Sequence, residues 1–191
     1  MREFIVTVSS VTPYLQHRMD DIKLEQWVKQ RGPTYERYDI SSPELIADFH
    51  SHIHFNGDNQ YFIPADHFRI SMIEAGKMVK GKVGGATKSM SNVVAAMFNI
   101  TPFQIPLPKW TSFDKRSAVN RNIKGRVIVI RPQWNTWAVE FNLLVDEDSI
   151  TTEMIEKIIT YSGKYIGIGS YRPQNKGPFG RYKLDSLKFL R

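Results

Sequence analysis

The feature of the sequence that most constrains the fold is a change of hydrophobic period between residues 137 and 159. In the first part every second residue is apolar, as in a strand with one buried face: Trp137, Val139, Phe141, Leu143 and Val145. In the second part apolar residues recur at the spacing of an amphipathic helix: Ile150, Met154, Ile155, Ile158 and Ile159. Ser149 or Thr151 can cap this helix, and Gly163 can end it. A strand followed at once by a helix predicts a mixed fold with Trp137 in its core.

Other segments extend this unit in both directions. The predicted elements are, in chain order, a strand at 3–11, a possible short helix near 20–30, a helix from Pro64 to about Lys80, a basic glycine-rich break at Gly81–Lys88, a helical segment at Ser89–Phe98, strands at Arg126–Ile130 and 137–145, the helix described above, a strand at Tyr165–Gly169 and a final strand at Arg181–Phe189. The order βαββαβ predicts an α+β, ferredoxin-like (RRM-like) fold. We expect one domain over residues 1–191, with a large insertion at about 12–63 and a proline-rich arm or loop at about 100–125.

The expected insertion contains a hairpin signal and three alternate histidines. Residues 49–63 read as two short strands around Asn56-Gly57, a pair that suits the positive φ angles of a tight turn. On such a strand His50, His52 and His54 would share one face, where a metal ion could bind. Alternate histidines also line polar sheet faces, so a protonation-sensitive surface or a nucleic-acid contact is the alternative to a metal site.

A glycine-rich segment, residues 163–181, follows the helix and is called the glycine loop below. Its glycines can bring the backbone close to a ligand, and rings and positive charges stand beside them. The candidate binding residues in it are Gly167, Gly169, Tyr171, Arg172, Lys176, Phe179, Gly180 and Arg181. Arginine and lysine bind phosphate through charge-assisted hydrogen bonds. The pattern predicts a site for an extended anion, with tight turns that bind nothing as the alternative.

Positive charge gathers in three segments of the chain. The formal net charge is +7, and residues 77–88, 109–131 and 172–191 hold 17 of the 26 lysines and arginines beside only two acids, Asp114 and Asp185. Outside the glycine loop, the predicted nucleic-acid contacts are Lys80, Lys82, Lys88, Lys115, Arg116, Arg121, Lys124 and Arg131. Aromatic residues near these charges are candidates for stacking on bases: Trp110, Phe113, Trp134, Tyr171 and Phe179.

The sequence lacks the characteristic motifs of several enzyme classes. Gly167-Ile168-Gly169 does not continue as a dinucleotide fingerprint because Arg172 stands where the third glycine belongs. Thr87 replaces the glycine that a phosphate loop requires before its lysine, Lys88. The one weak catalytic candidate is His17, which could act as a general base on an RNA 2′-hydroxyl. The sequence implies no cofactor.

Five short stretches carry a resemblance to known families: 11–17, 61–65, 131–134, 167–173 and 177–181. The glycine loop after the last helix of a ferredoxin-like unit resembles the signature of the repeat-associated (RAMP) RNA-binding proteins of CRISPR systems. The first two stretches look similar to the backbone subunits of that superfamily. The resemblance implies RNA binding through the loop and the sheet face. The last three stretches also look similar to uncharacterised phage and prophage proteins.

These patterns favour a sequence-tolerant binder of single-stranded DNA or RNA, phage-related and forming homo-oligomers along its ligand. One alternative is a metal-independent endoribonuclease of the same superfamily, and another is a protein-binding inhibitor of a host defence complex. The absence of cysteine excludes disulfides and fits a reducing compartment. The N-terminal segment has neither a signal-peptide pattern nor a long apolar run, so we expect a cytoplasmic protein, in a bacterial host cell if phage-encoded, with no membrane partner.

Overall fold

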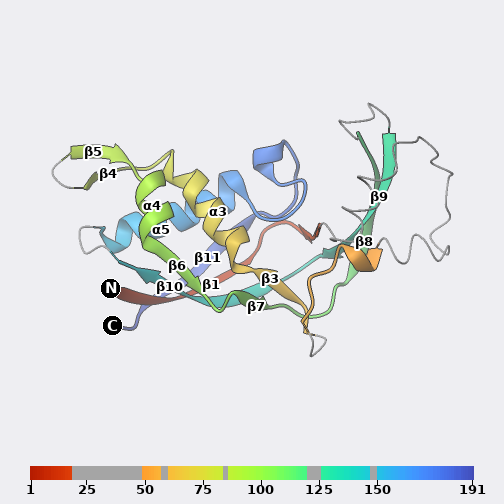
Figure 1. Cartoon of the computed structure of the whole chain (residues 1–191), viewed down its shortest axis with the longest axis horizontal. Coiled ribbons are helices and arrows are strands. Elements are labelled where there is room, and N and C mark those ends of the chain that lie inside the picture. The colour runs from red at the N-terminus through yellow and green to blue at the C-terminus, as the bar shows by residue number, and fades with distance from the viewer. Residues whose placement is uncertain (19–48, 57–59, 84–85, 120–125, 147–149) are drawn as a thin grey trace, which may run out of the picture.

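Four antiparallel strands form the central sheet of the computed structural model, in the order β11-β1-β10-β6 (Figure 1). They are β1 (Arg2–Ser10), β6 (Phe98–Thr101), β10 (Ala138–Val145) and β11 (Tyr182–Phe189). The structure describes residues 1–18, 49–56, 60–83, 86–119, 126–146 and 150–191. In this sheet the fourth, first, third and second core strands lie side by side, which is the strand order of a ferredoxin-like domain. The predicted α+β, ferredoxin-like fold class is confirmed.

Helices α3 (Ala65–Gly76) and α5 (Thr152–Tyr161) cover one face of the sheet (Figure 1). The Phe68 ring of α3 contacts the ring of Phe141, with a centroid distance of 4.9 Å, and α5 buries three isoleucines. Trp137 is 2% exposed in this core, as its alternation predicted. The predicted cap is also present, because the Thr151 side chain accepts a hydrogen bond from the Met154 amide. The periodicity of residues 137–159 therefore determines this half of the fold.

The opposite face of the sheet is polar and carries acidic side chains. Thr7 donates a hydrogen bond to the Glu140 carboxylate at 3.3 Å and accepts one from Ser186 at 3.0 Å. Asn142 donates to the Glu3 carboxylate at 3.3 Å. The same face also carries Lys183 and Lys188 of β11, which lie opposite Ser9 and Ile5 of β1, and Arg191 pairs with the Glu3 carboxylate at 2.8 Å. The sheet-face contact that the family resemblance implied therefore stays a prediction.

The prediction for the second core strand was wrong. That strand is β6, which directly follows the short helix α4 (Ser91–Met97), and not the segment Arg126–Ile130. The latter belongs to β9 (Arg126–Trp134), which lies between β8 (Ser112–Val119) and β2 (Tyr14–Leu15) in a separate sheet. A run of only four residues is too short for its period to separate a strand from a helix end.

The proline-rich arm contains strands and is not the loop that its composition predicted. The strand β7 (Gln104–Pro106) pairs with β3 (Phe62–Pro64), and β8 and β9 form a hairpin at one end of the molecule (Figure 1). The basic break at residues 81–88 is likewise a hairpin, of β4 (Lys80–Val83) and β5 (Ala86–Ser89). Edge strands and hairpins tolerate the prolines and glycines that argued against strands in the sequence.

The end of α5 differs from the prediction as well. Residues 165–169 are not a strand, because Ser162–Ile166 forms a widened π-helical turn, η1, that continues α5. The backbone then enters the glycine loop, where Pro173–Asn175 forms a short 3₁₀ turn, η2. The final strand, predicted at Arg181–Phe189, is present and spans Tyr182–Phe189.

The expected insertion remains a prediction, since its residues 19–48 and the possible helix near 20–30 lie outside the described residues. Within the described part, Phe55 pairs with Tyr61 and the Asn56 amide donates to the Gln60 carbonyl, which supports the predicted reversal of the chain. The turn residues 57–59 are not described. Among the described residues, no helix has both the length and the apolar character needed to cross a membrane.

Candidate nucleic-acid interface

The glycine loop folds onto itself and onto the segment that follows β1. The Ile168 amide donates to the Gly180 carbonyl at 2.9 Å, and the Gly180 amide donates to the Pro13 carbonyl at 2.8 Å. The Ser170 amide donates to the Leu15 carbonyl at 2.9 Å. These bonds fix the path of the loop and hold it close to β2.

The glycines of this loop pack against the protein's own backbone. A Cβ on Gly177 would lie 1.7 Å from the Tyr171 carbonyl oxygen, and one on Gly180 would lie 1.9 Å from that of Ile168. At Gly169 the nearest atom would be the Leu15 carbonyl oxygen, at 2.4 Å. Internal packing therefore explains why these positions are glycine. Contact of Gly167, Gly169 and Gly180 with a ligand stays a prediction.

Arg116 of β8 joins the arm to the glycine loop. Its guanidinium carbon lies 5.0 Å from the Tyr171 ring centroid and 4.8 Å from that of Phe179, within the range of cation–π attraction. The same guanidinium donates a hydrogen bond to the Asp114 carboxylate at 2.6 Å. One side chain thus brings together two segments that the sequence singled out separately, although its own charge is largely balanced by Asp114.

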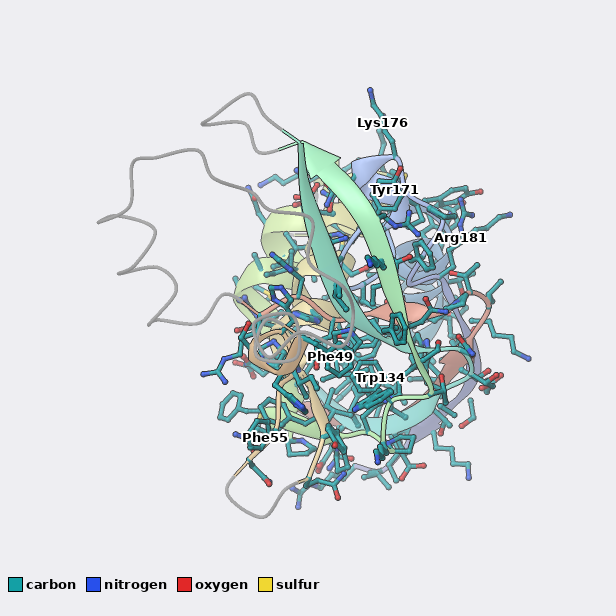
Figure 2. All side chains as sticks on the ribbon, turned by 90° about the vertical axis from the view of Figure 1, so that its right-hand side faces the viewer. Phe49, Phe55, Trp134, Tyr171, Lys176 and Arg181 are labelled. Atoms are coloured by element: carbon teal, nitrogen blue, oxygen red, sulfur yellow. The ribbon has the colours of Figure 1, made fainter. Side chains whose placement is uncertain are left out.

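Other cations of this region lie in the glycine loop beside that contact. Lys176 is exposed, and Arg172 and Arg181 are half-buried. Lys115 is exposed on the opposite face of the hairpin, because it neighbours Arg116 in β8 and successive side chains of a strand point to opposite faces. In Figure 2 the labelled Tyr171, Lys176 and Arg181 lie near one another, away from the buried Trp134. Arg172 donates to the Gly169 carbonyl at 3.1 Å and to the Gln174 side chain, so part of its role is to hold the loop.

We call this region the loop–hairpin surface. It consists of Arg116, Arg131, Tyr171, Arg172, Lys176, Phe179 and Arg181. Arg131 of β9 belongs to it because its backbone pairs with that of Asp114 on β8. The hairpin and the loop therefore present one continuous group of cations around two aromatic rings.

Three predicted contacts lie elsewhere. Lys80, Lys82 and Lys88 are exposed on the β4–β5 hairpin, which projects at the opposite end of the molecule from β8 and β9 (Figure 1). The structure therefore divides the predicted contacts between two surfaces. Arg121 and Lys124 lie outside the described residues.

The remaining aromatic residues that were predicted to stack on bases differ in how far they are buried. Trp134 is completely buried, and its ring nitrogen donates to the Pro108 carbonyl at 2.7 Å, so this ring belongs to the core and cannot stack on a base. Trp110 packs against Phe49, with a centroid distance of 4.9 Å. Phe113 is 44% exposed and remains able to contact a ligand.

The three alternate histidines do not share one strand face. Residues 49–51 are helical, so His50 is exposed while His52 is buried, and the His52 Nδ1 donates to the Arg18 carbonyl at 2.9 Å. In the described part of the chain, no three histidine or acidic side chains gather as metal ligands would. His17 is exposed, and its ring lies 4.4 Å from that of His52.

His54 and His67 form a second pair of imidazoles, with ring centroids 6.0 Å apart. Burial lowers the pKa of each to about 4, assisted by Arg18 near His54 and by His54 and Arg172 near His67. The His67 Nδ1 is hydrogen-bonded to the Tyr14 hydroxyl at 3.0 Å, and burial raises the pKa of that hydroxyl. Both imidazoles are therefore neutral at pH 7, and a pKa this low makes them poor general bases.

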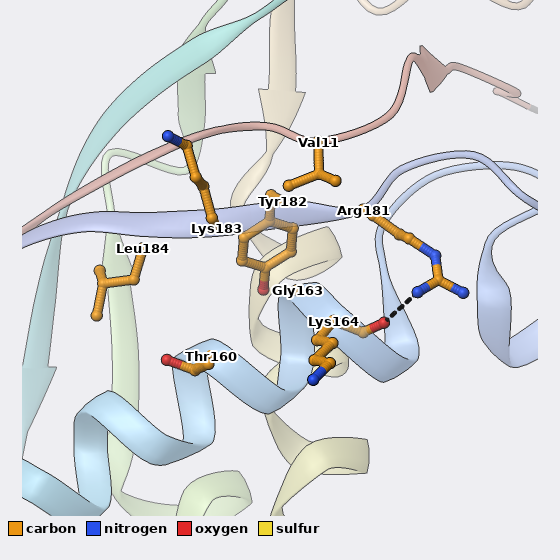
Figure 3. Close-up of a pocket in the computed structure, with 8 residues that line it drawn as sticks. All are labelled: Val11, Thr160, Gly163, Lys164, Arg181, Tyr182, Lys183 and Leu184. Atoms are coloured by element: carbon orange, nitrogen blue, oxygen red, sulfur yellow. Dashed lines mark hydrogen bonds between the residues drawn. The ribbon is translucent and has the colours of Figure 1, made fainter.

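The sequence analysis passed over a second basic and aromatic group, at the junction of α5 and η1. A pocket of about 390 Å³ lies between this junction and β11, lined in part by Thr160, Lys164 and Arg181 (Figure 3). Tyr165 beside it is 45% exposed. The strand predicted at Tyr165–Gly169 does not bring these side chains together, whereas the helical turn does. The available signal was the recurrence of lysine and tyrosine from Lys157 onward.

No protein-family model matches the sequence, and no curated protein matches it. Among solved structures, the protein is similar to a chain in the cryo-EM structure of the Type III-B Cmr-beta bound to cognate target RNA, with a TM-score of 0.53 and 10% sequence identity. The match covers 100% of this chain and 61% of that chain. At this identity the similarity shows the fold alone, and it supports a RAMP-like fold as the sequence resemblance implied.

Proposed function

We propose that this protein binds single-stranded nucleic acid through the loop–hairpin surface. The observation that carries the proposal is the placement of Arg116 over the rings of Tyr171 and Phe179, since it sets the cations of the hairpin beside those of the glycine loop. Single-stranded nucleic acid carries a chain of linked phosphates, so one molecule of it can contact β8 and the glycine loop at once. Its bases supply flat surfaces for the exposed rings.

The charge distribution supports a polyanion. From Ser162 to Lys183 the chain has no acidic residue, and it carries Lys164, Arg172, Lys176, Arg181 and Lys183. Because Asp114 balances Arg116, the phosphate contacts fall mainly to Arg172, Lys176 and Arg181. Binding should therefore release counterions and weaken as salt rises.

The structural similarity is consistent with nucleic acid as the class of ligand. The similar chain belongs to an assembly whose structure was determined with its cognate target RNA. Stacking and phosphate contacts serve DNA and RNA equally, because only contacts to the 2′-hydroxyl separate them. The choice between the two is therefore left to the binding experiment.

The test is fluorescence anisotropy with labelled single-stranded DNA, single-stranded RNA and duplex DNA, at two salt concentrations in EDTA. The key variant is Lys176→Ala, because this side chain is exposed and no hydrogen bond or ion pair of the side chain is described. We expect about threefold weaker binding to single strands and a salt slope smaller by about 0.7, the value for one lost phosphate contact.

The matched control is Lys188→Ala, an exposed lysine of β11 about 20 Å along the strand from Tyr182. It should bind as the wild type does. No binding by the wild type, or equal binding by Lys176→Ala, would overturn the proposal.

We also propose that the chain forms one domain and that copies lie side by side along the strand. The second basic surface, on the β4–β5 hairpin, lies away from the first and can contact the same strand in a longer complex. A phage-related role rests on the sequence resemblance alone.

The same samples test the two alternatives. RNA cleaved in EDTA, with the activity lost in His17→Ala, would favour the endoribonuclease. Tight association with a host defence complex that survives nuclease treatment would favour the protein-binding inhibitor.

A further inference from the structure

Two lysines and two tyrosines form a compact surface where α5 passes into η1. Lys157, Tyr161 and Tyr165 follow one another at intervals of four residues, and Lys164 precedes the last of them. The two rings pack edge to face with centroids 5.3 Å apart. The Lys157 Nζ lies 5.6 Å from the Tyr161 ring centroid, and the Lys164 Nζ lies 5.3 Å from that of Tyr165. We call these four residues the lysine–tyrosine surface.

The widened turn of η1 creates this surface. On its inner side, a Cβ on Gly163 would lie 2.1 Å from the Tyr182 carbonyl oxygen, and the Ser162 hydroxyl is hydrogen-bonded to the Tyr182 hydroxyl at 2.5 Å. The backbone therefore sits tightly on β11, and Ile166 turns into the core. Lys164 and Tyr165, which are adjacent in sequence, both face outward as a result. Single π-helical turns of this kind occur frequently at functional sites.

The pocket beside this surface joins it to the loop–hairpin surface. Arg181 belongs to both regions, because it lies in the glycine loop and its guanidinium donates to the Lys164 carbonyl at 2.9 Å (Figure 3). Val11 and Leu184 contribute apolar lining, and Arg181 and Lys164 lie at one side. An apolar hollow with cations beside it suits the sugar and phosphate of a nucleotide.

Ion pairing does not account for the two lysines, and core packing does not fully account for the tyrosines. In the described part of the chain, no acidic side chain pairs with Lys157 or Lys164. Tyr161 packs in part against the core, whereas Tyr165 keeps 45% of its surface exposed. The nearest acid on this face of α5 is Glu153, one turn before Lys157, and it limits the surface on the side of the start of α5.

We infer that a bound single strand continues from the loop–hairpin surface past Arg181 onto the lysine–tyrosine surface. There Tyr165 stacks on a base, and Lys157 and Lys164 neutralise the phosphates on either side of it. This inference rests on the proposed function and extends its contact surface by a further nucleotide. The occupant is nucleic acid because a pair of rings lies between two cations, and a single strand offers bases between successive phosphates.

The experiment compares Tyr165→Ala, Tyr165→Phe and the pair Lys157→Ala with Lys164→Ala, using labelled single strands of about 6 and about 20 nucleotides, lengths that bracket common site sizes. With the longer strand, Tyr165→Ala should bind at least about fivefold more weakly, and Tyr165→Phe should stay within about twofold of the wild type. The lysine pair should reduce the salt slope by about 1.4. Thermal unfolding checks that all three variants are folded, and Lys188→Ala serves again as the control.

The outcomes separate this inference from the proposed function. If Lys176→Ala weakens binding while the Tyr165 and Lys157–Lys164 variants bind as the wild type does, the inference is wrong and the proposed function stands. If the wild type binds no single strand, both are wrong. Cross-linking of a photoreactive base to Tyr165 in the wild type would support the inference directly.

Discussion

Gly180 occupies a position that no residue with a side chain can take without moving the backbone. Its φ angle of +72° lies in the left-handed region, and a Cβ there would lie 1.9 Å from the Ile168 carbonyl oxygen. Gly180→Ala should therefore lower the free energy of unfolding by about 2–4 kcal/mol, from backbone strain and the displacement of Ile168. Denaturant unfolding measures the change.

Asn175→Ala is the control for this prediction, because Asn175 is exposed in the same loop. Its unfolding free energy should stay within about 0.5 kcal/mol of the wild-type value. Equal stability of the two variants would show that the loop adapts to a side chain at Gly180.

His67 should make the stability depend on pH. Its folded-state pKa of about 4 lies below the ordinary value of 6.5, so the unfolded chain binds more protons between these two values. Stability is complete above pH 6.5 and falls as the pH drops toward 4. His67→Gln can keep a hydrogen bond to Tyr14 but cannot take up a proton, so it should lose about 1–3 kcal/mol less than the wild type between pH 7 and 4.5.

Urea unfolding at several pH values checks this difference, with the exposed His50→Gln as a variant that should follow the wild type. If His67→Gln and the wild type lose the same stability, the pH dependence arises elsewhere. His54 contributes in the same direction, because burial lowers its pKa as well.

The burial of a single residue could be predicted where the residue lies in a long segment with regular hydrophobic spacing. Trp137 lies in a nine-residue alternation and is buried as predicted. Trp134 stands outside that alternation, beside basic residues, and its burial depends on packing against Tyr14 from a distant segment. Contacts between distant segments leave no local period, so the sequence could not separate a core tryptophan from a ligand-binding one.

At the scale of elements, Arg116 is expected to hold the β8–β9 hairpin against the glycine loop. Arg116→Ala removes its contacts with Tyr171 and Phe179 and leaves Asp114 without this partner. We expect a loss of about 1–2 kcal/mol and faster amide exchange in the glycine loop. Arg116→Lys should have an intermediate effect, because lysine keeps the charge but not the planar fork.

Hydrogen exchange with mass spectrometry measures this effect. Lys115→Ala, at the exposed neighbouring position, should leave exchange in the loop unchanged. Equal exchange in Arg116→Ala and Lys115→Ala would show that other contacts attach the hairpin.

The sequence predicted long helices and strands better than short ones. The long alternation and the capped helix gave β10 and α5, whereas the four residues of β6 were divided between an expected helix and an expected loop. The turn η1 was missed for a physical reason: Gly163 reads as a helix stop, but here it allows the helix to widen against Tyr182. The basic and aromatic composition of the glycine loop predicted the candidate site. The contact of β8 with that loop could be seen only in the folded structure.

At the scale of the whole molecule, two basic surfaces at opposite ends predict a dependence on ligand length. Removing Lys80, Lys82 and Lys88 together by alanine substitution should weaken binding to a strand of about 20 nucleotides by about tenfold. Binding to about 6 nucleotides should remain unchanged, because so short a strand reaches only the loop–hairpin surface. Titration anisotropy gives both affinities. An equal loss for both lengths would place the hairpin in the same site, and no loss for either would leave it without a role in binding.

The two ends of the chain lie against each other at the edge of the central sheet (Figure 1). The Glu3 amide donates to the Arg191 carbonyl at 2.8 Å, and the Leu190 amide donates to the Glu3 carbonyl at the same distance. A short linker could therefore close the backbone into a ring, and the ring could be reopened in an exposed turn far from the glycine loop. Such a circular permutant would keep the sheet order while placing new ends, and any fused reporter, at a chosen point on the surface.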